Sequence, residues 1–186
     1  VKELVENSID AGATLISVDV KGGGIKEITV NDNGCGIAFE DLPVAFMPHS
    51  TSKISTVEDL DSINTLGFRG EALTSIAAVA MVTLRSKTSD AEMGGIIEIN
   101  GGNVERHLPE ASPNGTYITI RNLFYNTPAR AKFLRSQKRE ETEIRNIISR
   151  IILANPNISI KYNVDGKNIF YSSGKNLESA FCTVYG

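Results

Sequence analysis

The stretch KELVENSIDAG (residues 2–12) predicts the first element of the fold, an amphipathic helix. Its apolar stripe follows the helical period and consists of Val1, Leu4, Val5, Ser8 and Ile9. Glu3 and Asn7 lie on the opposite side, four residues apart, so their side chains converge. A carboxylate there is suited to take a proton from water, and an amide oxygen is a ligand that Mg²⁺ accepts. The alternative is a solvated polar face with a Lys2–Glu6 pair.

The stretch DNGCGI (residues 32–37) ends a predicted strand in a glycine-rich turn. Gly34 and Gly36 allow the backbone to approach a flat ligand, and Asp32 can accept a hydrogen bond from an exocyclic amino group. It is not a dinucleotide-binding fingerprint, because Phe39 stands where that motif has its third glycine. The alternative is an ordinary Asp-Asn-Gly turn.

A polar stretch over residues 49–64 leads into GFRGEAL (residues 67–73). The segment after it, residues 71–79, predicts a helix with Ala72, Leu73, Ile76 and Val79 buried. A helix N-terminus suits phosphate, and Lys53 and Arg69 add positive charge. The alternative is a flexible surface loop that ends in a glycine turn.

The remaining pattern predicts alternating strands and helices. Strands are expected near residues 14–21, 25–32, 81–88, 94–100, 103–109, 116–122, 158–164 and 168–172, with Gly22-Gly23-Gly24 as the first hairpin turn. Helices are expected near residues 39–46, from Thr127-Pro128, along an isoleucine stripe that ends at Asn155-Pro156, and from Asn176. This order favours an α+β two-layer sandwich with a mixed, mostly antiparallel sheet and helices on one face.

Composition is compatible with one domain. The chain has 186 residues, of which 41% are hydrophobic, enough for one core. It contains neither a long apolar run that would span a membrane nor a signal peptide. Cys35 and Cys182 suit a reducing compartment and show no metal spacing, and a metal pair of His49 and His107 is not expected.

Positive charge is concentrated in residues 121–150. Eight basic residues against three acidic ones give this stretch a net charge of +5, so the rest of the chain, with a total of −3, carries −8. Clustered charge attracts phosphate backbones, which favours weak, sequence-independent DNA contact. The candidate DNA-contacting residues are Arg130, Lys132, Arg135, Lys138 and Arg139. The alternative is a solvated helix face.

The chain resembles the N-terminal ATPase region of the MutL family of DNA mismatch-repair proteins. MutL belongs to the superfamily that includes type II topoisomerases, ninety-kilodalton heat-shock chaperones and sensor histidine kinases, known as the GHKL or Bergerat-fold ATPases. The segments that carry the resemblance are residues 2–12, 49–53, 67–76 and LFYNTPAR (residues 123–130). The last segment speaks against a topoisomerase, and no phospho-acceptor histidine points to a kinase.

The resemblance implies a role for each motif residue. Glu3 is expected to be the general base, and Asn7 to bind ATP and hold Mg²⁺. Asp32 is expected to read the adenine amino group, with Gly36 nearby and Thr116 acting through ordered water. The lid over the phosphates is expected to contain Ser52, Lys53, Gly67, Phe68, Arg69, Gly70 and Glu71. Pro48 stands where many relatives have arginine.

The resemblance also implies that an N-terminal segment, a lysine from a second domain and a C-terminal region of the family are absent from this sequence. Residues 1–175 are expected to form the ATPase domain, and residues 176–186 the start of a connector. Expected partners are ATP, DNA, mismatch-recognition and other repair proteins, and a second copy in a nucleotide-dependent N-terminal homodimer. The expected location is the cytoplasm near the nucleoid in a bacterium, or the nucleus in a eukaryote.

Three functions remain open. The first is an ATP-hydrolysing switch whose nucleotide state controls dimer closure. The second is a binding module that orders residues 49–66, expected to be disordered without nucleotide, but does not hydrolyse ATP. The third is a DNA-binding scaffold that acts through residues 121–150.

Overall fold

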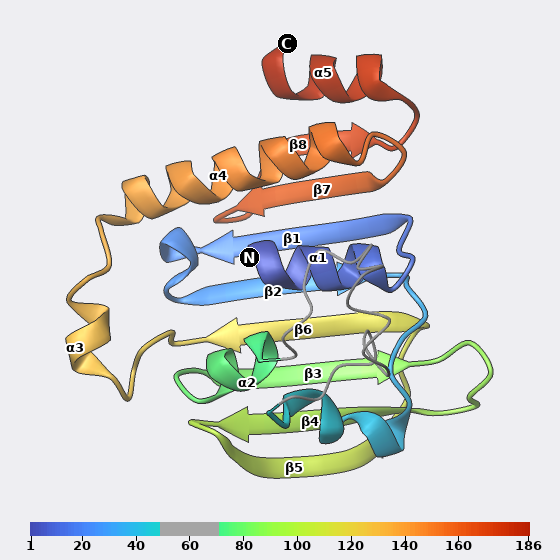
Figure 1. Cartoon of the computed structure of the whole chain (residues 1–186), viewed down its shortest axis with the longest axis vertical. Coiled ribbons are helices and arrows are strands. Elements are labelled where there is room, and N and C mark those ends of the chain that lie inside the picture. The colour runs from blue at the N-terminus through green and yellow to red at the C-terminus, as the bar shows by residue number, and fades with distance from the viewer. Residues whose placement is uncertain (49–70) are drawn as a thin grey trace, which may run out of the picture.

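An eight-stranded sheet is the frame of the part of the chain that the structure, a computed structural model, describes: residues 1–48 and 71–186 (Figure 1). The strands are β1 (Leu15–Lys21), β2 (Glu27–Asp32), β3 (Met81–Lys87), β4 (Gly94–Asn100), β5 (Asn103–Glu110), β6 (Gly115–Arg121), β7 (Ser159–Val164) and β8 (Lys167–Ser173). Their order across the sheet is β5-β4-β3-β6-β2-β1-β7-β8. Neighbours are antiparallel except β1 and β7, which are parallel.

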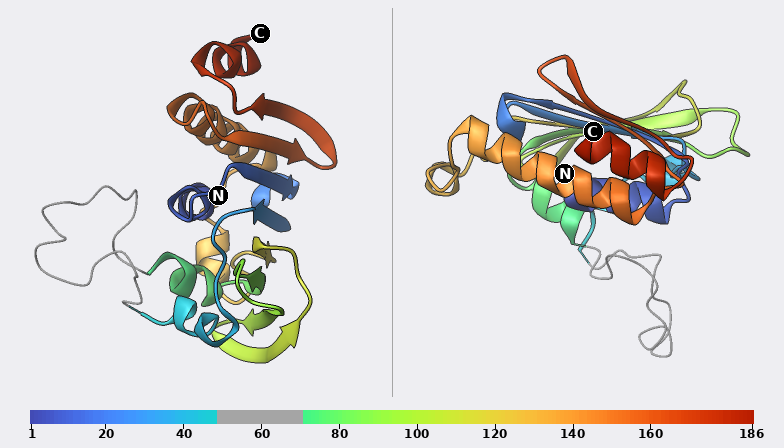
Figure 2. Two further views of the ribbon diagram at one scale, coloured as in Figure 1. Left: turned by 90° about the vertical axis from the view of Figure 1, so that its right-hand side faces the viewer. Right: turned by 90° about the horizontal axis from the view of Figure 1, so that it is seen from above.

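Helices cover one face of this sheet, which makes two layers (Figure 2). They are α1 (Lys2–Asp10), α2 (Ala72–Ala77), α4 (Gln137–Ala154) and α5 (Leu177–Tyr185). The short helix α3 (Pro128–Ala131) lies beyond the ends of the strands, in the connection between β6 and α4. The predicted α+β sandwich, mostly antiparallel with helices on one face, is therefore confirmed.

The core lies between the two layers. Helix α4 buries the predicted isoleucine stripe, with Ile148 and Ile152 fully inaccessible, because its apolar residues recur at the helical period. Leu4 and Val5 of α1 and Ala180 of α5 belong to the same core cluster. The division of the chain at residue 175 stays a prediction.

The register of three adjoining strands places a row of polar side chains on the helix-covered face. Asp32 of β2 pairs with Thr116 of β6, which in turn pairs with Ser86 of β3. Because side chains alternate along a strand, the next row, Asn31, Tyr117 and Arg85, points to the opposite face. The row of Asp32, Thr116 and Ser86 thus lies at the edge of the core, and its Asp32 end contacts α1 through Ser8.

Two predicted details differ in the structure. Instead of one helix near residues 39–46, there are two 3-10 turns, η2 (Phe39–Asp41) and η3 (Val44–Phe46). Pro43 lies between them and has no N–H to donate to a preceding carbonyl, so a continuous α-helix does not form. The second difference concerns burial: Val79 is buried as predicted, but Ala72, Leu73 and Ile76 are only half-buried.

The predicted first hairpin turn is present as the Gly22–Gly24 segment, η1.

Candidate functional site

The carboxylate of Asp32 is held where α1 meets the end of β2. The Ser8 hydroxyl donates to Asp32 Oδ2 at 2.7 Å, and the Gly34 N–H donates to Asp32 Oδ1 at 2.9 Å. Ser8 itself is buried, while Asp32 is half-buried. A carboxylate has about four acceptor positions, and these two bonds use one on each oxygen. Asp32 is therefore fixed in orientation and still able to accept hydrogen bonds.

The turn after Asp32 is enclosed by its neighbours. A Cβ on Gly36, which has φ +73°, would lie 2.1 Å from the Lys87 carbonyl oxygen. A Cβ on Gly34 would lie 2.8 Å from the Ala11 carbonyl oxygen. Both glycines are required by close approach of the backbone to other chain segments, and Gly36 is required by its positive φ as well.

Asn33 anchors the same turn to the start of β1. Its side-chain oxygen accepts from the N–H groups of Thr14 and Leu15 at 2.9 and 2.8 Å, and its amide donates to Thr14 Oγ1 at 2.9 Å. Cys35 N–H donates to the Ala11 carbonyl at 2.9 Å. The turn is thus held on both sides by hydrogen bonds within the protein.

Ser86 joins this turn to the start of β6. Its hydroxyl accepts from Ile37 N–H at 2.8 Å and donates to the Gly115 carbonyl at 2.8 Å, and its oxygen lies 3.0 Å from Thr116 Oγ1. Ser86 is 1% exposed, whereas Thr116 is half-buried. The two residues predicted for base recognition, Asp32 and Thr116, therefore lie side by side, each held by a buried serine.

On α1 the predicted pair Glu3 and Asn7 keeps its helical spacing, with Glu3 exposed and Asn7 half-buried. The Lys2–Glu6 pair is present at 3.4 Å between Lys2 Nζ and Glu6 Oε1. Glu6 is not on a solvated face, however: it is 7% exposed, and its Oε2 makes no hydrogen bond within the described residues. The helix turns it inward beside Val5, which is fully buried.

Six of the predicted lid residues lie outside the described residues: Ser52, Lys53, Gly67, Phe68, Arg69 and Gly70, as does the rest of the segment 49–66. Glu71 is described. It is exposed and is the N-cap residue of α2, without a side-chain cap bond.

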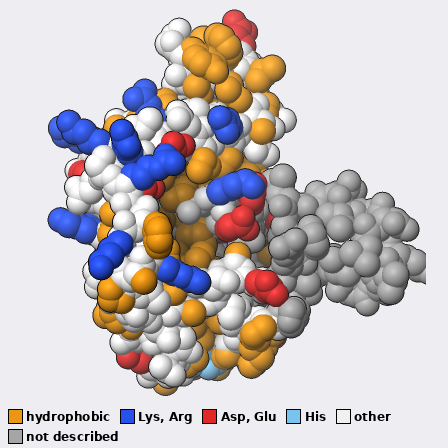
Figure 3. Space-filling model, turned by 60° about the vertical axis from the view of Figure 1, so that its left-hand side comes forward, with side chains coloured by type: hydrophobic (Ala, Val, Ile, Leu, Met, Phe, Trp, Pro, Cys, Tyr) orange, Lys and Arg blue, Asp and Glu red, His pale blue; other side chains and the backbone are white. Residues whose placement is uncertain are grey.

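The five candidate DNA-contacting residues are all exposed. They lie on α3, the segment after it and the first turn of α4, and Figure 3 shows Lys and Arg side chains on that side of the molecule. Arg135 bonds Glu143 at 3.2 Å, which partly neutralises it. The other four form no salt bridge with a carboxylate of residues 1–48 or 71–186: Arg130, Lys132, Lys138 and Arg139.

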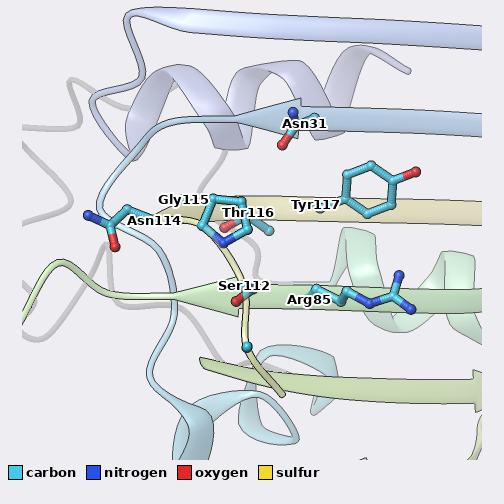
Figure 4. A pocket seen from close by; sticks show the side chains of 9 residues that line it. Asn31, Arg85, Ser112, Asn114, Gly115, Thr116 and Tyr117 are labelled. Atoms are coloured by element: carbon cyan, nitrogen blue, oxygen red, sulfur yellow. The ribbon is translucent and has the colours of Figure 1, made fainter. Parts of the chain in front are cut away.

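A cavity of about 230 Å³ lies on the opposite, open face of the sheet. Figure 4 shows Asn31, Arg85 and Tyr117 from three neighbouring strands beside Ser112 and Asn114 of the loop before β6. Arg85 is engaged by Glu110 at 2.6 Å. Gly115 and Thr116 also line this cavity, but Asp32 does not, so it is distinct from the cluster around Asp32.

Sequence reasoning missed Ser8 and Ser86 as partners of the site. Ser8 was expected only as a member of the apolar stripe of α1, and no local pattern distinguishes Ser86 from other strand serines. Among residues 1–48 and 71–186, no cluster of three or more His, Cys, Asp or Glu side chains is arranged to hold a metal ion. The same part of the chain contains no helix with the length and apolar character needed to cross a membrane.

Comparison with known proteins identifies the family. The sequence model described as histidine kinase-, DNA gyrase B- and HSP90-like ATPase matches residues 1–121, well over half of the chain. The chain belongs to this ATPase family. The predicted Bergerat fold is the fold of that family, and the cluster around Asp32 and Gly36 falls inside the matched residues.

Within this ATPase family, the resemblance to MutL proteins is confirmed. The chain is 50% identical over 187 residues to the DNA mismatch repair protein MutL of Pelotomaculum thermopropionicum, covering 100% of this chain and 31% of that protein. It is 48% identical over 188 residues to MutL of Clostridium acetobutylicum, covering 100% of this chain and 30% of that protein. The chain thus spans about a third of the length of these curated relatives.

Solved structures agree with this assignment. The MutL ATPase domain of Aquifex aeolicus complexed with ADP superposes with a TM-score of 0.78 at 30% identity, covering 99% of this chain and 66% of that one. The N-terminal domain of a DNA repair protein gives a TM-score of 0.81 at 28% identity, covering 100% and 55% of the two chains. The arrangement of sheet and helices is therefore that of a MutL ATPase domain.

Proposed function

We propose that this chain binds and hydrolyses ATP as the switch domain of a MutL-like mismatch-repair protein. The observation that carries the proposal is the pairing of Asp32 with Thr116 on the helix-covered face, with Asp32 fixed by Ser8 and Gly34. The likeness to a MutL ATPase domain complexed with ADP supports a nucleotide as the ligand.

Asp32 reads the adenine amino group in this proposal. Its carboxylate only accepts hydrogen bonds, and an exocyclic amino group is a donor of matching polarity. Gly36 lies two residues beyond Gly34, and neither position has room for a Cβ, so in this proposal the base packs against bare backbone there. Thr116 completes the subsite, directly or through an ordered water.

Glu3 acts as the general base. It is exposed on α1, one helical turn from Asn7, and so is free to take a proton from the water that attacks the γ-phosphate. Asn7 supplies an amide oxygen for Mg²⁺, which proteins commonly hold by one or two side chains together with substrate phosphates. A single half-buried amide fits such a site. When bound, Mg²⁺ supplies charge that stabilises the phosphates.

The lid is proposed from the sequence alone. Ser52, Lys53 and the segment from Gly67 to Glu71 contact the phosphates through a basic side chain and backbone N–H groups. Closure of this lid over nucleotide is the step that couples ATP to an N-terminal homodimer and to mismatch-recognition and other repair proteins. Because the parent protein acts on DNA in this proposal, we expect it in the cytoplasm near the nucleoid in a bacterium, or in the nucleus in a eukaryote.

DNA contact is the second proposed function. The exposed cations on α3 and the first turn of α4 form a surface suited to phosphate backbones (Figure 3). Residues 121–150 contain no aromatic residues beyond Phe124, Tyr125 and Phe133, which gives little support to base stacking. The contact is therefore weak and independent of sequence, and it supplements the nucleotide switch.

Turnover distinguishes a hydrolysing switch from a module that only binds. With Mg²⁺ and ATP, phosphate release should fall about 100-fold or more in Glu3→Gln, because general bases contribute roughly that much, while nucleotide affinity is retained. Glu92→Gln, an exposed glutamate after β3, is the matched control and should turn over normally. Turnover unchanged in Glu3→Gln would remove Glu3 as the base. No turnover in any variant, with ATP bound, would favour the binding module.

A further inference from the structure

We infer that Ser86 sets the preference of the site for a base with an amino group over one with a carbonyl group, by fixing the direction in which the Thr116 hydroxyl points its proton. The inference rests on the proposed function, because it takes the ligand at Asp32 and Thr116 to be a nucleotide. Of the two ways in which Thr116 can complete the subsite, it takes the direct one, in which the Thr116 hydroxyl meets the group at position 6 of the base without a bridging water. Ser86 does not touch the base. It acts as a positioning residue through Thr116.

The hydrogen bonds of Ser86 leave little freedom. A serine hydroxyl has one proton and two lone pairs. The Gly115 carbonyl, 2.8 Å away, offers no proton, so the Ser86 proton is donated to it. The Ile37 N–H, also 2.8 Å away, can only donate, so it takes one lone pair of Ser86. The remaining lone pair faces Thr116 Oγ1 at 3.0 Å and can only accept.

The Thr116 hydroxyl is therefore committed as a donor to Ser86. Since a hydroxyl has a single proton, the Thr116 oxygen is left with lone pairs alone for a ligand. Ser86 is 1% exposed and held from three sides, so it cannot easily turn away to release Thr116. Toward a ligand, the half-buried Thr116 hydroxyl can therefore only accept a hydrogen bond, although a free hydroxyl could donate or accept.

The Asp32 carboxylate beside Thr116 is also a hydrogen-bond acceptor. Thr116 and Asp32 are register partners on adjoining strands, and both lie in the row on the helix-covered face. Ser8 and Gly34 each donate to the Asp32 carboxylate, which has no proton of its own to offer. Two acceptors side by side match the two hydrogens of an amino group and oppose a carbonyl oxygen. The pair thus selects against a 6-oxo purine.

The test compares ADP with IDP, which carry a 6-amino and a 6-oxo purine and are not consumed by hydrolysis. Calorimetric titration gives the ratio of their affinities in the unmodified protein, in Ser86→Ala, in Thr116→Val and in the double variant. Ser86→Ala should lower the ADP preference by about three- to tenfold, the range of one ordinary hydrogen bond, because the freed Thr116 can donate to the 6-oxo group. Thr116→Val should also lower it. Adding Ser86→Ala to Thr116→Val should change it no further.

The outcomes separate this inference from a purely structural role of Ser86. If Ser86→Ala weakens ADP and IDP by the same factor and leaves their ratio unchanged, the inference is wrong. Should Ser86→Ala fail to fold, the near-isosteric Thr116→Val decides alone, and an unchanged ratio again overturns the inference. Failure of the unmodified protein to bind either nucleotide would overturn the proposed function, and this inference with it.

Discussion

Gly36 and Gly12 share a backbone φ of +73°, yet their surroundings differ. A Cβ on Gly36 would lie 2.1 Å from the Lys87 carbonyl oxygen, whereas a Cβ on Gly12 would meet nothing within 4 Å. The positive φ strains any L side chain at either position. Of the two, Gly36 alone combines that strain with a backbone contact, and it alone lies in the turn next to Asp32.

Substitutions at Gly12 and Gly36 separate the cost of backbone strain from the cost of the close contact with Lys87. Gly12→Ala should lower the free energy of unfolding by about 1–2 kcal/mol, the cost of a left-handed L-residue. Gly36→Ala should cost clearly more and also weaken ADP binding, because the turn must move away from Lys87. Urea unfolding and calorimetric titration of both variants measure this. Equal reductions in stability, with ADP affinity intact in both, would contradict the proposed role of the turn.

At this scale the sequence was informative about residues within one motif and uninformative about interactions between motifs. Asp32 and Gly36 could be predicted because a strand followed by an Asp-Asn-Gly turn has local chemistry. The bonds of Ser86 to Ile37 and Gly115 depend on the register of β3 with β6, which no local pattern encodes. The roles of Glu3 and Asn7 stay predictions.

At the scale of elements, an ion-pair cluster joins three central strands. Glu27 of β2 contacts Lys21 of β1 at 2.7 Å and Arg121 of β6 at 2.9 Å. Hydrogen bonds from Lys21 and Arg121 lower the pKa of Glu27 below its ordinary value of 4.5. A carboxyl with a depressed pKa in the folded state contributes stability above its unfolded pKa and loses it as the pH falls through the folded pKa.

The pH dependence of this cluster can be measured. Glu27→Gln should destabilise the protein at pH 6 by about 1 kcal/mol or less, since the pairs are partly exposed. The difference from the unmodified protein should shrink as the pH is lowered from 6 to 3. Urea unfolding at each pH gives the difference, and Glu92→Gln is the control. A difference that does not change with pH would show that the Glu27 charge contributes nothing.

The elements themselves were mostly predictable, because hydrophobic period and turn residues are local signals. The hairpin turn at Gly22–Gly24 and the start of α5 at Asn176 are where turn and cap chemistry indicates them. The prediction of one helix near residues 39–46 was wrong, because Pro43 interrupts the hydrogen bonding that a continuous helix needs. The strand order was not predictable from local pattern, since it pairs strands far apart in the chain.

At the scale of the whole molecule, charge is divided between the basic stretch and an acidic remainder. Reversing Lys132, Lys138 and Arg139 to Glu should weaken DNA binding and flatten its salt dependence, by about one unit of the log–log slope for each DNA phosphate that is no longer neutralised. Lys175→Glu, exposed between β8 and α5, is the control. Titrating duplex DNA at several salt concentrations measures the slope. A slope equal to that of the unmodified protein would remove this surface from the proposed function.

The most direct test of the nucleotide site is calorimetric titration with a nonhydrolysable ATP analogue and Mg²⁺. Asp32→Asn replaces an acceptor by an amide in the row that faces the helices. Asp19→Asn makes the same change in β1, where Asp19 accepts from Asn163 at 2.8 Å on the other face of the sheet. Binding by the unmodified protein and by Asp19→Asn, weakened about tenfold or more in Asp32→Asn, is the predicted result. Equal affinity in all three proteins would contradict the placement of the nucleotide at Asp32.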